Sequence, residues 1–121
     1  MSREKVTLGR LGEEMARLYY VAHGYEILTS RFRTREGELD LVCRRRGVVA
    51  FVEVKTRRGE GCGAPAEAVT RRKLGRMRRV AGRYLADTEV GGVARYRFDV
   101  VGVTLRTDEG GLRLDVLKGV I

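Results

Sequence analysis

The chain has 121 residues, 43% of them hydrophobic, and a formal net charge of +9. This length and composition predict one compact domain spanning residues 1–121 and exclude a disordered chain. No apolar run approaches the roughly 20 residues that cross a bilayer, and the N-terminal residues lack the apolar core of a secretion signal. We therefore expect a cytoplasmic protein, and its basic charge favours a polyanionic partner such as nucleic acid.

The few sulfur and imidazole ligands exclude a zinc site of the usual kind. Cys43 and Cys62 do not have zinc-binding spacing, and His23 is the single histidine. We expect two reduced thiols, Cys43 in a strand and Cys62 in a loop. His23 directly precedes Gly24 and is expected at a helix end rather than in a site.

A first helix is predicted from Thr7, as its N-cap, to a stop at Gly24. Apolar residues recur there at helical spacing and predict a buried stripe, which consists of Leu8, Leu11, Met15, Leu18 and Ala22. Glu13 points away from this stripe, on a face of small residues with Tyr20. That face either borders a cleft or faces water, and the sequence leaves both open.

The remaining elements follow from apolar patterns between turn residues. Strands are expected over 25–29, 38–44 and 48–56, then a long helix from 65 or 66 to 86. Residues 95–100 alternate polar and apolar, as a half-buried strand does, and 112–117 form the last strand. This order predicts an α/β domain with a mixed central sheet flanked by helices.

A tight hairpin places acidic residues opposite each other. If Arg46 and Gly47 form a two-residue turn, paired residue numbers sum to 93, so Asp40 faces Glu53 and Glu38 faces Lys55. These four charged side chains then share one face with Val49 and Phe51, and the other face carries Leu39, Leu41, Val52 and Val54.

Opposed carboxylates at a separation of roughly 4.5–5.5 Å between Cβ atoms repel each other. A shared proton, a divalent cation or the nearby Lys55 could offset this repulsion. A hard cation such as Mg²⁺ needs only one or two carboxylates, since it keeps several waters. The alternative to a metal site is that these charged residues form the solvent-exposed face of a strand. The apolar Val49 and Phe51 on the same face argue against this alternative.

Five segments in order resemble one protein family. They are GEEMA at 12–16, GELDLV at 37–42, FVEVKTR at 51–57, GAPAEAVTRRK at 63–73 and RFDVVGV at 97–103. Together they resemble the YraN-like bacterial family of the PD-(D/E)XK nuclease superfamily, which is similar to Holliday-junction resolvases. The resemblance implies a restriction-endonuclease-like fold.

The resemblance also implies roles for individual residues. Asp40 and Glu53 would hold Mg²⁺ or Mn²⁺ with the carbonyl of Val54, while Lys55 would orient or polarise the attacking water. Glu13 matches an acid of the first helix that would position a water or second ion.

Other family positions have supporting roles or depart from the pattern. Thr70 and Lys73 match residues that could touch the phosphate backbone, and Arg31 stands where the family has asparagine. Glu38 is expected to pair with Lys55. Asp99 is expected to form a structural ion pair with an arginine.

The second predicted helix carries a basic stripe of four arginines, Arg72, Arg76, Arg79 and Arg83. Apolar residues occupy its opposite side, so the helix is amphipathic. A polar face with few acids favours phosphate contacts over solvated charge.

The combined interpretation is a metal-dependent endonuclease that hydrolyses phosphodiesters of DNA. The resemblance to resolvases implies branched or junction DNA and a homodimer. The alternatives are a non-catalytic nucleic-acid-binding or scaffold protein that retains the nuclease fold, and a ribonuclease.

Overall fold

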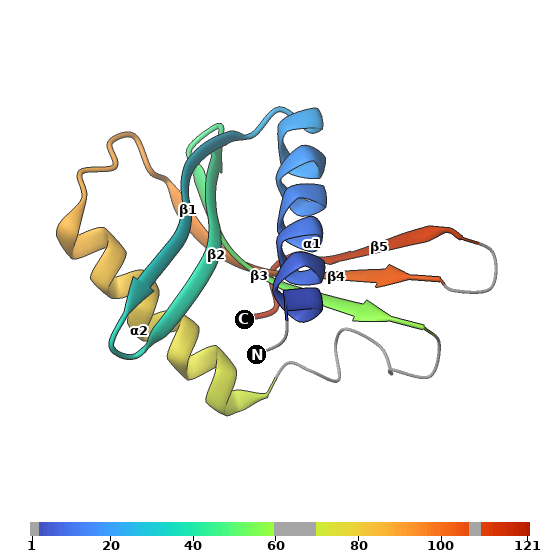
Figure 1. Cartoon of the computed structure of the whole chain (residues 1–121). Coiled ribbons are helices and arrows are strands. Elements are labelled where there is room, and N and C mark those ends of the chain that lie inside the picture. The colour runs from blue at the N-terminus through green and yellow to red at the C-terminus, as the bar shows by residue number, and fades with distance from the viewer. Residues whose placement is uncertain (1–2, 60–69, 107–109) are drawn as a thin grey trace.

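The computed structural model describes residues 3–59, 70–106 and 110–121, and its elements follow the predicted order (Figure 1). They are α1 (Arg3–Ala22), β1 (Glu26–Thr34), β2 (Gly37–Arg45), β3 (Val48–Arg58), α2 (Arg71–Asp87), β4 (Arg95–Leu105) and β5 (Leu112–Leu117). Neither helix is long and apolar enough to span a membrane.

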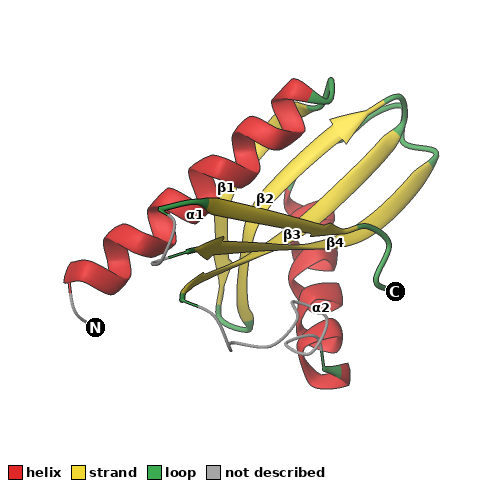
Figure 2. Ribbon diagram, turned by 90° about the vertical axis from the view of Figure 1, so that its right-hand side faces the viewer, coloured by secondary structure: helices red, strands yellow, loops and turns green. Residues whose placement is uncertain are grey.

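The five strands form one sheet in the order β1-β2-β3-β4-β5. Only β3 and β4 are parallel, and the other neighbours are antiparallel. A parallel pair needs a long crossover, which contains α2. The helices cover opposite faces of the sheet (Figure 2). The predicted mixed sheet is confirmed and is consistent with a restriction-endonuclease-like fold.

The first helix begins earlier than predicted. Thr7 lies inside α1, where its hydroxyl donates to the carbonyl of Arg3 at 2.9 Å, so the predicted N-cap is wrong. The end is as predicted, because Gly24 adopts φ 86°, a left-handed conformation that favours glycine.

The buried face of α1 differs from the predicted leucine stripe. Leu11 and Leu18 are 42% and 45% exposed, whereas Gly12, Ala16 and Tyr20 are buried. A Cβ at Gly12 would lie 1.7 Å from Oγ1 of Thr56 in β3, so a side chain there would force the helix away from the sheet. The small-residue face therefore packs on the sheet. This side of α1 is buried because only small residues let the helix backbone approach the strands so closely.

The second helix begins at Arg71 rather than at 65 or 66. Thr70 has extended backbone angles and is the N-cap, its side chain accepting from the backbone N–H of Lys73 at 3.2 Å. The predicted residues before Thr70, like Cys62, lie outside the described part of the chain. The amphipathic pattern is confirmed by the buried residues of α2, which are Met77, Val80, Ala81 and Tyr84.

A buried carboxylate joins α1, β4 and the C-terminal residues. Asp99 is fully buried and accepts hydrogen bonds from the Tyr20 hydroxyl at 2.7 Å, from Arg97 at 2.8 Å and from the Gly119 N–H at 3.0 Å. Burial, then the charge of Asp99, raises the pKa of Tyr20 and keeps it a donor. The predicted structural pair with an arginine is confirmed, although this end of β4 is more buried than a half-exposed strand.

The thiol in β2 belongs to the core. Cys43 is a free, fully buried cysteine, as expected for a strand residue. Burial raises its pKa to about 12, so the reactive thiolate is scarce at neutral pH.

Candidate functional site

The β2–β3 hairpin has the predicted turn and register. Arg46 and Gly47 adopt φ 48° and 77°, as a two-residue hairpin turn requires. The ladder runs from the Arg45–Val48 pair to the Leu41–Val52 pair, with numbers summing to 93. It ends there, so the predicted pairs of Asp40 with Glu53 and of Glu38 with Lys55 are not part of it.

The side-chain alternation of β2 breaks at Asp40. Leu39 packs in the core cluster under α2, whereas Leu41 packs in the cluster under α1, so the prediction that they share a face is wrong. On the neighbouring strand, Arg31 lies at the same level and has φ 55°, a strained value for arginine. The irregularity in both strands allows Asp40 to turn toward α1.

Three carboxylates from two elements meet beside this irregularity. Oxygens of Glu13 in α1 and of Glu38 and Asp40 in β2 all lie within 4.8 Å of one another. Glu13 and Asp40 line a pocket of about 250 Å³ between α1 and the β1–β2 ribbon. The structure therefore brings together two of the predicted site residues, Asp40 and Glu13, and Glu38 joins them.

The surroundings of Asp40 in the acidic cluster disfavour its ionised form. Burial raises the pKa of Asp40 to about 7, opposed by the Val54 N–H, which donates to Oδ2 at 2.6 Å. A hydrogen bond with Glu38 and the charges of Glu13 and Glu38 contribute to the same rise in the pKa. A bound cation would offset this crowding, because it favours the ionised carboxylate.

Two arginines of β1 neutralise the other acids of the cluster. Nε of Arg31 lies 2.7 Å from Glu13, and Nε of Arg33 lies 2.9 Å from Glu38. The predicted Glu38–Lys55 pair is therefore corrected to Glu38–Arg33. Sequence reasoning noted Arg31 only as a departure from the family pattern and missed both ion pairs, because it ended the first strand at residue 29. Phe32 between the two arginines was the available signal that the strand continues.

Lys55 and Val54 lie on the other side of Glu13. These three residues line a second pocket, of about 380 Å³, between the first half of α1 and the end of β3. Glu53 is half-buried but does not belong to the three-acid cluster. Phe51 packs under α2, whereas Val52 and Val54 pack under α1. Strand alternation therefore places the Glu53 and Lys55 side chains on the α2 side, so Lys55 meets the second pocket from the end of β3.

The basic stripe of α2 is exposed but partly neutralised. Arg79 pairs with Glu36 at 2.8 Å and Arg83 with Asp87 at 3.1 Å. Within residues 3–59, 70–106 and 110–121, the expectation that few acids pair with this face therefore holds for Arg72 and Arg76 but not for Arg79 and Arg83. Thr70 begins the same helix as its N-cap, and Lys73 is half-buried in its first turn.

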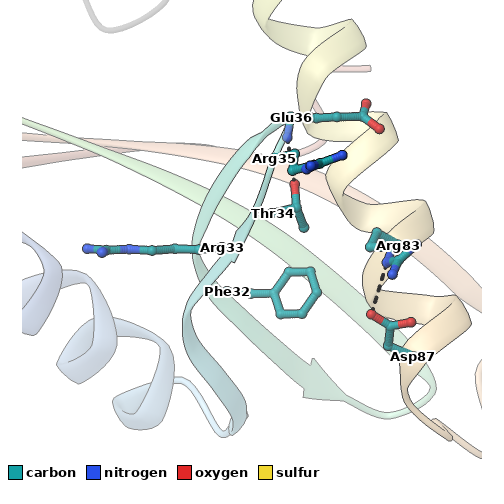
Figure 3. A pocket seen from close by; sticks show the side chains of 7 residues that line it. All are labelled: Phe32, Arg33, Thr34, Arg35, Glu36, Arg83 and Asp87. Carbon is teal, nitrogen blue, oxygen red and sulfur yellow. Dashed lines mark hydrogen bonds and ion pairs between the residues drawn. The ribbon is translucent and has the colours of Figure 1, made fainter.

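A pocket of about 500 Å³ separates the β1–β2 turn from α2 (Figure 3). Its lining carries three arginines, together with Glu36 and Asp87. Figure 3 shows the Phe32 ring pointing toward α2 and the Arg33 side chain pointing away from it. Since Arg33 pairs with Glu38, the turn connects the basic helix to the acidic cluster.

Comparisons with known proteins agree on one family. The model of the family described as "Uncharacterised protein family UPF0102" matches residues 12–103. A UPF0102 protein of Beutenbergia cavernae is 45% identical over 118 residues, covering 98% of each chain. One of Frankia alni is 47% identical over 117 residues, covering 97% of this chain and 96% of the relative. The chain therefore belongs to the uncharacterised protein family UPF0102, the YraN-like family.

Proposed function

We propose that this protein is a divalent-cation-dependent endonuclease that hydrolyses phosphodiester bonds of DNA. The observation that carries the proposal is the convergence of Glu13, Glu38 and Asp40, with oxygens within 4.8 Å, beside the pocket of Lys55. Crowded carboxylates are costly unless they share a proton or a cation. An ion pair network that served only the fold would gain little from such crowding.

The donor set fits a hard cation. Carboxylate oxygens are the preferred ligands of Mg²⁺ and Mn²⁺, and Asp40 with Glu13 and Glu38 would hold the ion. Glu53 and the Val54 carbonyl are the further oxygen donors that the family resemblance implies. When bound, the cation would supply Lewis-acid activation of water and neutralise charge on the phosphate.

The chain's own groups account for the remaining chemistry. Lys55 is exposed and lines the pocket that Glu13 also lines. Its ammonium would orient a water and stabilise charge on the phosphate if the side chain turned into that pocket. Arg31 and Arg33 bring guanidinium groups to the rim of the cluster, and guanidinium matches phosphate oxygens in pairs. Val54 N–H holds the Asp40 carboxylate in place.

The choice of DNA, and of branched DNA in particular, follows the resemblance to resolvases, and the cytoplasm is its expected compartment. The proposal is tested by a cleavage panel of linear, flapped, junction and RNA substrates with Mg²⁺ or Mn²⁺ and with EDTA. We expect metal-dependent cutting of DNA, lost in Asp40→Ala and in Lys55→Ala while DNA affinity is largely retained. Each loss should be at least about 10²-fold, as for other charge-stabilising groups.

The same panel separates the alternatives. Binding without cleavage on every substrate would support a nucleic-acid-binding or scaffold protein and refute the enzyme. Cutting restricted to RNA would support a ribonuclease. Arg95→Ala is a matched control, since Arg95 is an exposed basic residue that pairs with Val48 at the start of β3, whereas Val54 and Lys55 lie toward the other end of that strand.

The basic face of α2 is expected to bind the phosphate backbone. Among the described residues, Arg72 and Arg76 have no carboxylate partner, unlike Arg79 and Arg83. Replacing both with alanine should reduce the slope of log affinity against log salt by about 1–2, because each lost phosphate contact removes roughly 0.9. Fluorescence anisotropy over a salt series measures this slope, and an unchanged slope would show that the contact surface lies elsewhere.

A further inference from the structure

We propose that two copies of this chain associate edge to edge through β5 and extend the sheet across a twofold axis. This inference is independent of the proposed nuclease activity. Of the described strands, β5 lies at one edge of the sheet, with β4 as its single neighbour. An open edge is a template for pairing with another strand.

The backbone hydrogen bonds show which groups of β5 face outward. The Leu105 carbonyl accepts from the Gly59 N–H at 2.8 Å, so Leu105 directs its backbone groups toward β3. Leu105 pairs with Leu112 of β5. Because Leu105 directs its backbone groups the other way, this is a pair without hydrogen bonds, and the N–H and C=O of Leu112 point to the open edge. By strand alternation, Leu114 and Val116 do the same.

The neighbouring position agrees with this assignment. Gly111 turns inward, since its carbonyl accepts from the Arg106 N–H at 2.8 Å. Three alternate residues of β5 thus present donors and acceptors at the spacing of an antiparallel ladder.

The sequence of β5 is complementary to itself in one antiparallel register. Centring the pair on Leu114 places Leu114 opposite its own copy and Leu112 opposite Val116 of the second copy. These are the outward-facing residues, so each can exchange two backbone hydrogen bonds. Between them, Arg113 lies opposite Asp115 of the second copy, in the closely spaced pair without hydrogen bonds, and opposite charges there are favourable.

α1 carries exposed apolar residues on the face of the sheet where the β5 side chains Leu114 and Val116 pack. Met15 packs in the same core cluster as Leu114 and Val116 of β5. Leu11 and Leu18, on the turns before and after Met15, are 42% and 45% exposed, and Leu112 is 44% exposed. A twofold axis perpendicular to the sheet keeps both copies of α1 on the same face, so these leucines would lie on one side of the extended sheet.

The second copy fits this surface better than an unrelated partner does. Only a twofold-related β5 meets each Arg113 with an Asp115 and each Asp115 with an Arg113. The exposed leucines on the α1 face of the sheet would gain from burial in the same arrangement. Oligomeric state is therefore the property to measure.

Analytical ultracentrifugation of the full chain over a concentration series tests the interface. We expect the wild-type protein to reach twice the mass of one chain. Arg113→Asp would place two carboxylates opposite each other, and Asp115→Arg would place two guanidinium groups opposite each other. Each substitution should raise the dimer dissociation constant at least about tenfold, since like charges across an interface repel.

An equimolar mixture of the two variants makes the test specific. Arg113 and Asp115 also pair within one chain, at 3.1 Å, and both variants lose that pair. Their mixture nevertheless restores opposite charges between the copies, so a mixed dimer should form when neither variant dimerises alone. Circular dichroism checks folding, and Leu18→Glu, at an exposed helix position, should weaken the dimer independently.

Three results would overturn the interface. The first is a wild-type chain that stays monomeric at every concentration, and the second is a wild-type dimer that neither charge variant weakens. The third is a mixture of the two variants that stays monomeric. None of these readouts depends on cleavage, so a failure here is distinct from a failure of the nuclease proposal.

Discussion

The Asp40→Asn variant is expected to melt at a higher temperature than the wild-type protein at about pH 8 in EDTA, and this gain should disappear near pH 4. Burial, together with the neighbouring Glu38 and Glu13, raises the pKa of Asp40 from 3.8 to about 7. Between these two values the unfolded chain releases the proton while the folded chain keeps it. Rising pH therefore favours unfolding, and the penalty is complete above about pH 7.

The size of the effect follows from the shift. One pKa unit corresponds to about 1.4 kcal/mol, so the ionised Asp40 costs the folded state on the order of 4 kcal/mol. Asparagine retains an oxygen that accepts from the Val54 N–H, and its amide can donate to Glu38. Burying the asparagine amide also costs free energy and offsets part of this gain. We therefore expect a net increase in the free energy of unfolding of roughly 2 kcal/mol, or about 5–10 °C in melting temperature for a domain of this size.

Thermal denaturation followed by circular dichroism across this pH range measures the gain. Asp87→Asn is the matched control, because Asp87 is exposed and pairs with Arg83 on the surface of α2. It should change stability by less than about 0.5 kcal/mol. If Asp40→Asn were less stable than wild type at every pH, the Asp40 carboxylate would be a structural acceptor rather than a crowded charge.

The same variant links stability to function. Under the proposed mechanism Asp40→Asn also loses metal-dependent cleavage, since a neutral amide is a poorer ligand for a hard cation. A protein that becomes more stable as it loses activity is typical of a strained site. Stabilisation together with retained cleavage would place the metal ligands elsewhere.

The second large effect is expected in the core. Asp99→Ala should destabilise the fold by about 3–5 kcal/mol, the usual cost of removing one partner of a buried pair. It leaves Arg97 without its carboxylate, and it removes the acceptor of the Tyr20 hydroxyl and of the Gly119 N–H. Three segments, α1, β4 and the C-terminal residues, lose their common partner.

Urea denaturation gives the free energy of unfolding for this comparison. Asp99→Asn, which keeps an acceptor but not the charge, should fall between wild type and the alanine variant. Asp87→Ala serves as the surface control. A loss below about 1 kcal/mol for Asp99→Ala, comparable to a single neutral hydrogen bond, would mean that the network adds little beyond packing.

Local chemistry made part of the fold predictable. The β2–β3 turn was found correctly because Gly47 tolerates the positive φ that a two-residue hairpin requires, and a two-residue turn leaves one register near it. The buried side of α2 was also found correctly, since an amphipathic helix on a sheet has only one apolar face to bury.

The candidate site was only partly predictable, because the regular hairpin geometry does not extend to it. The motif identified Asp40 and Glu13, and the structure brings them together with Glu38. Extending the hairpin register beyond Leu41 gave the wrong neighbours, because the irregularity at Arg31 and Asp40 interrupts the alternation. Such an interruption of the side-chain alternation depends on contacts between β1 and β2, and neither strand's own sequence pattern reveals it.

The sequence by itself determined the order of the elements, the hairpin turn and the apolar face of α2, because each depends on residues close together in the chain. The mixed sheet was inferred from that order of elements. Only the tertiary structure decided which face of α1 is buried and which arginine neutralises each acid. Gly12 reaches Thr56, and Arg33 reaches Glu38, across separate elements. Such contacts depend on the distance between packed backbones, and periodicity along one segment does not contain that distance.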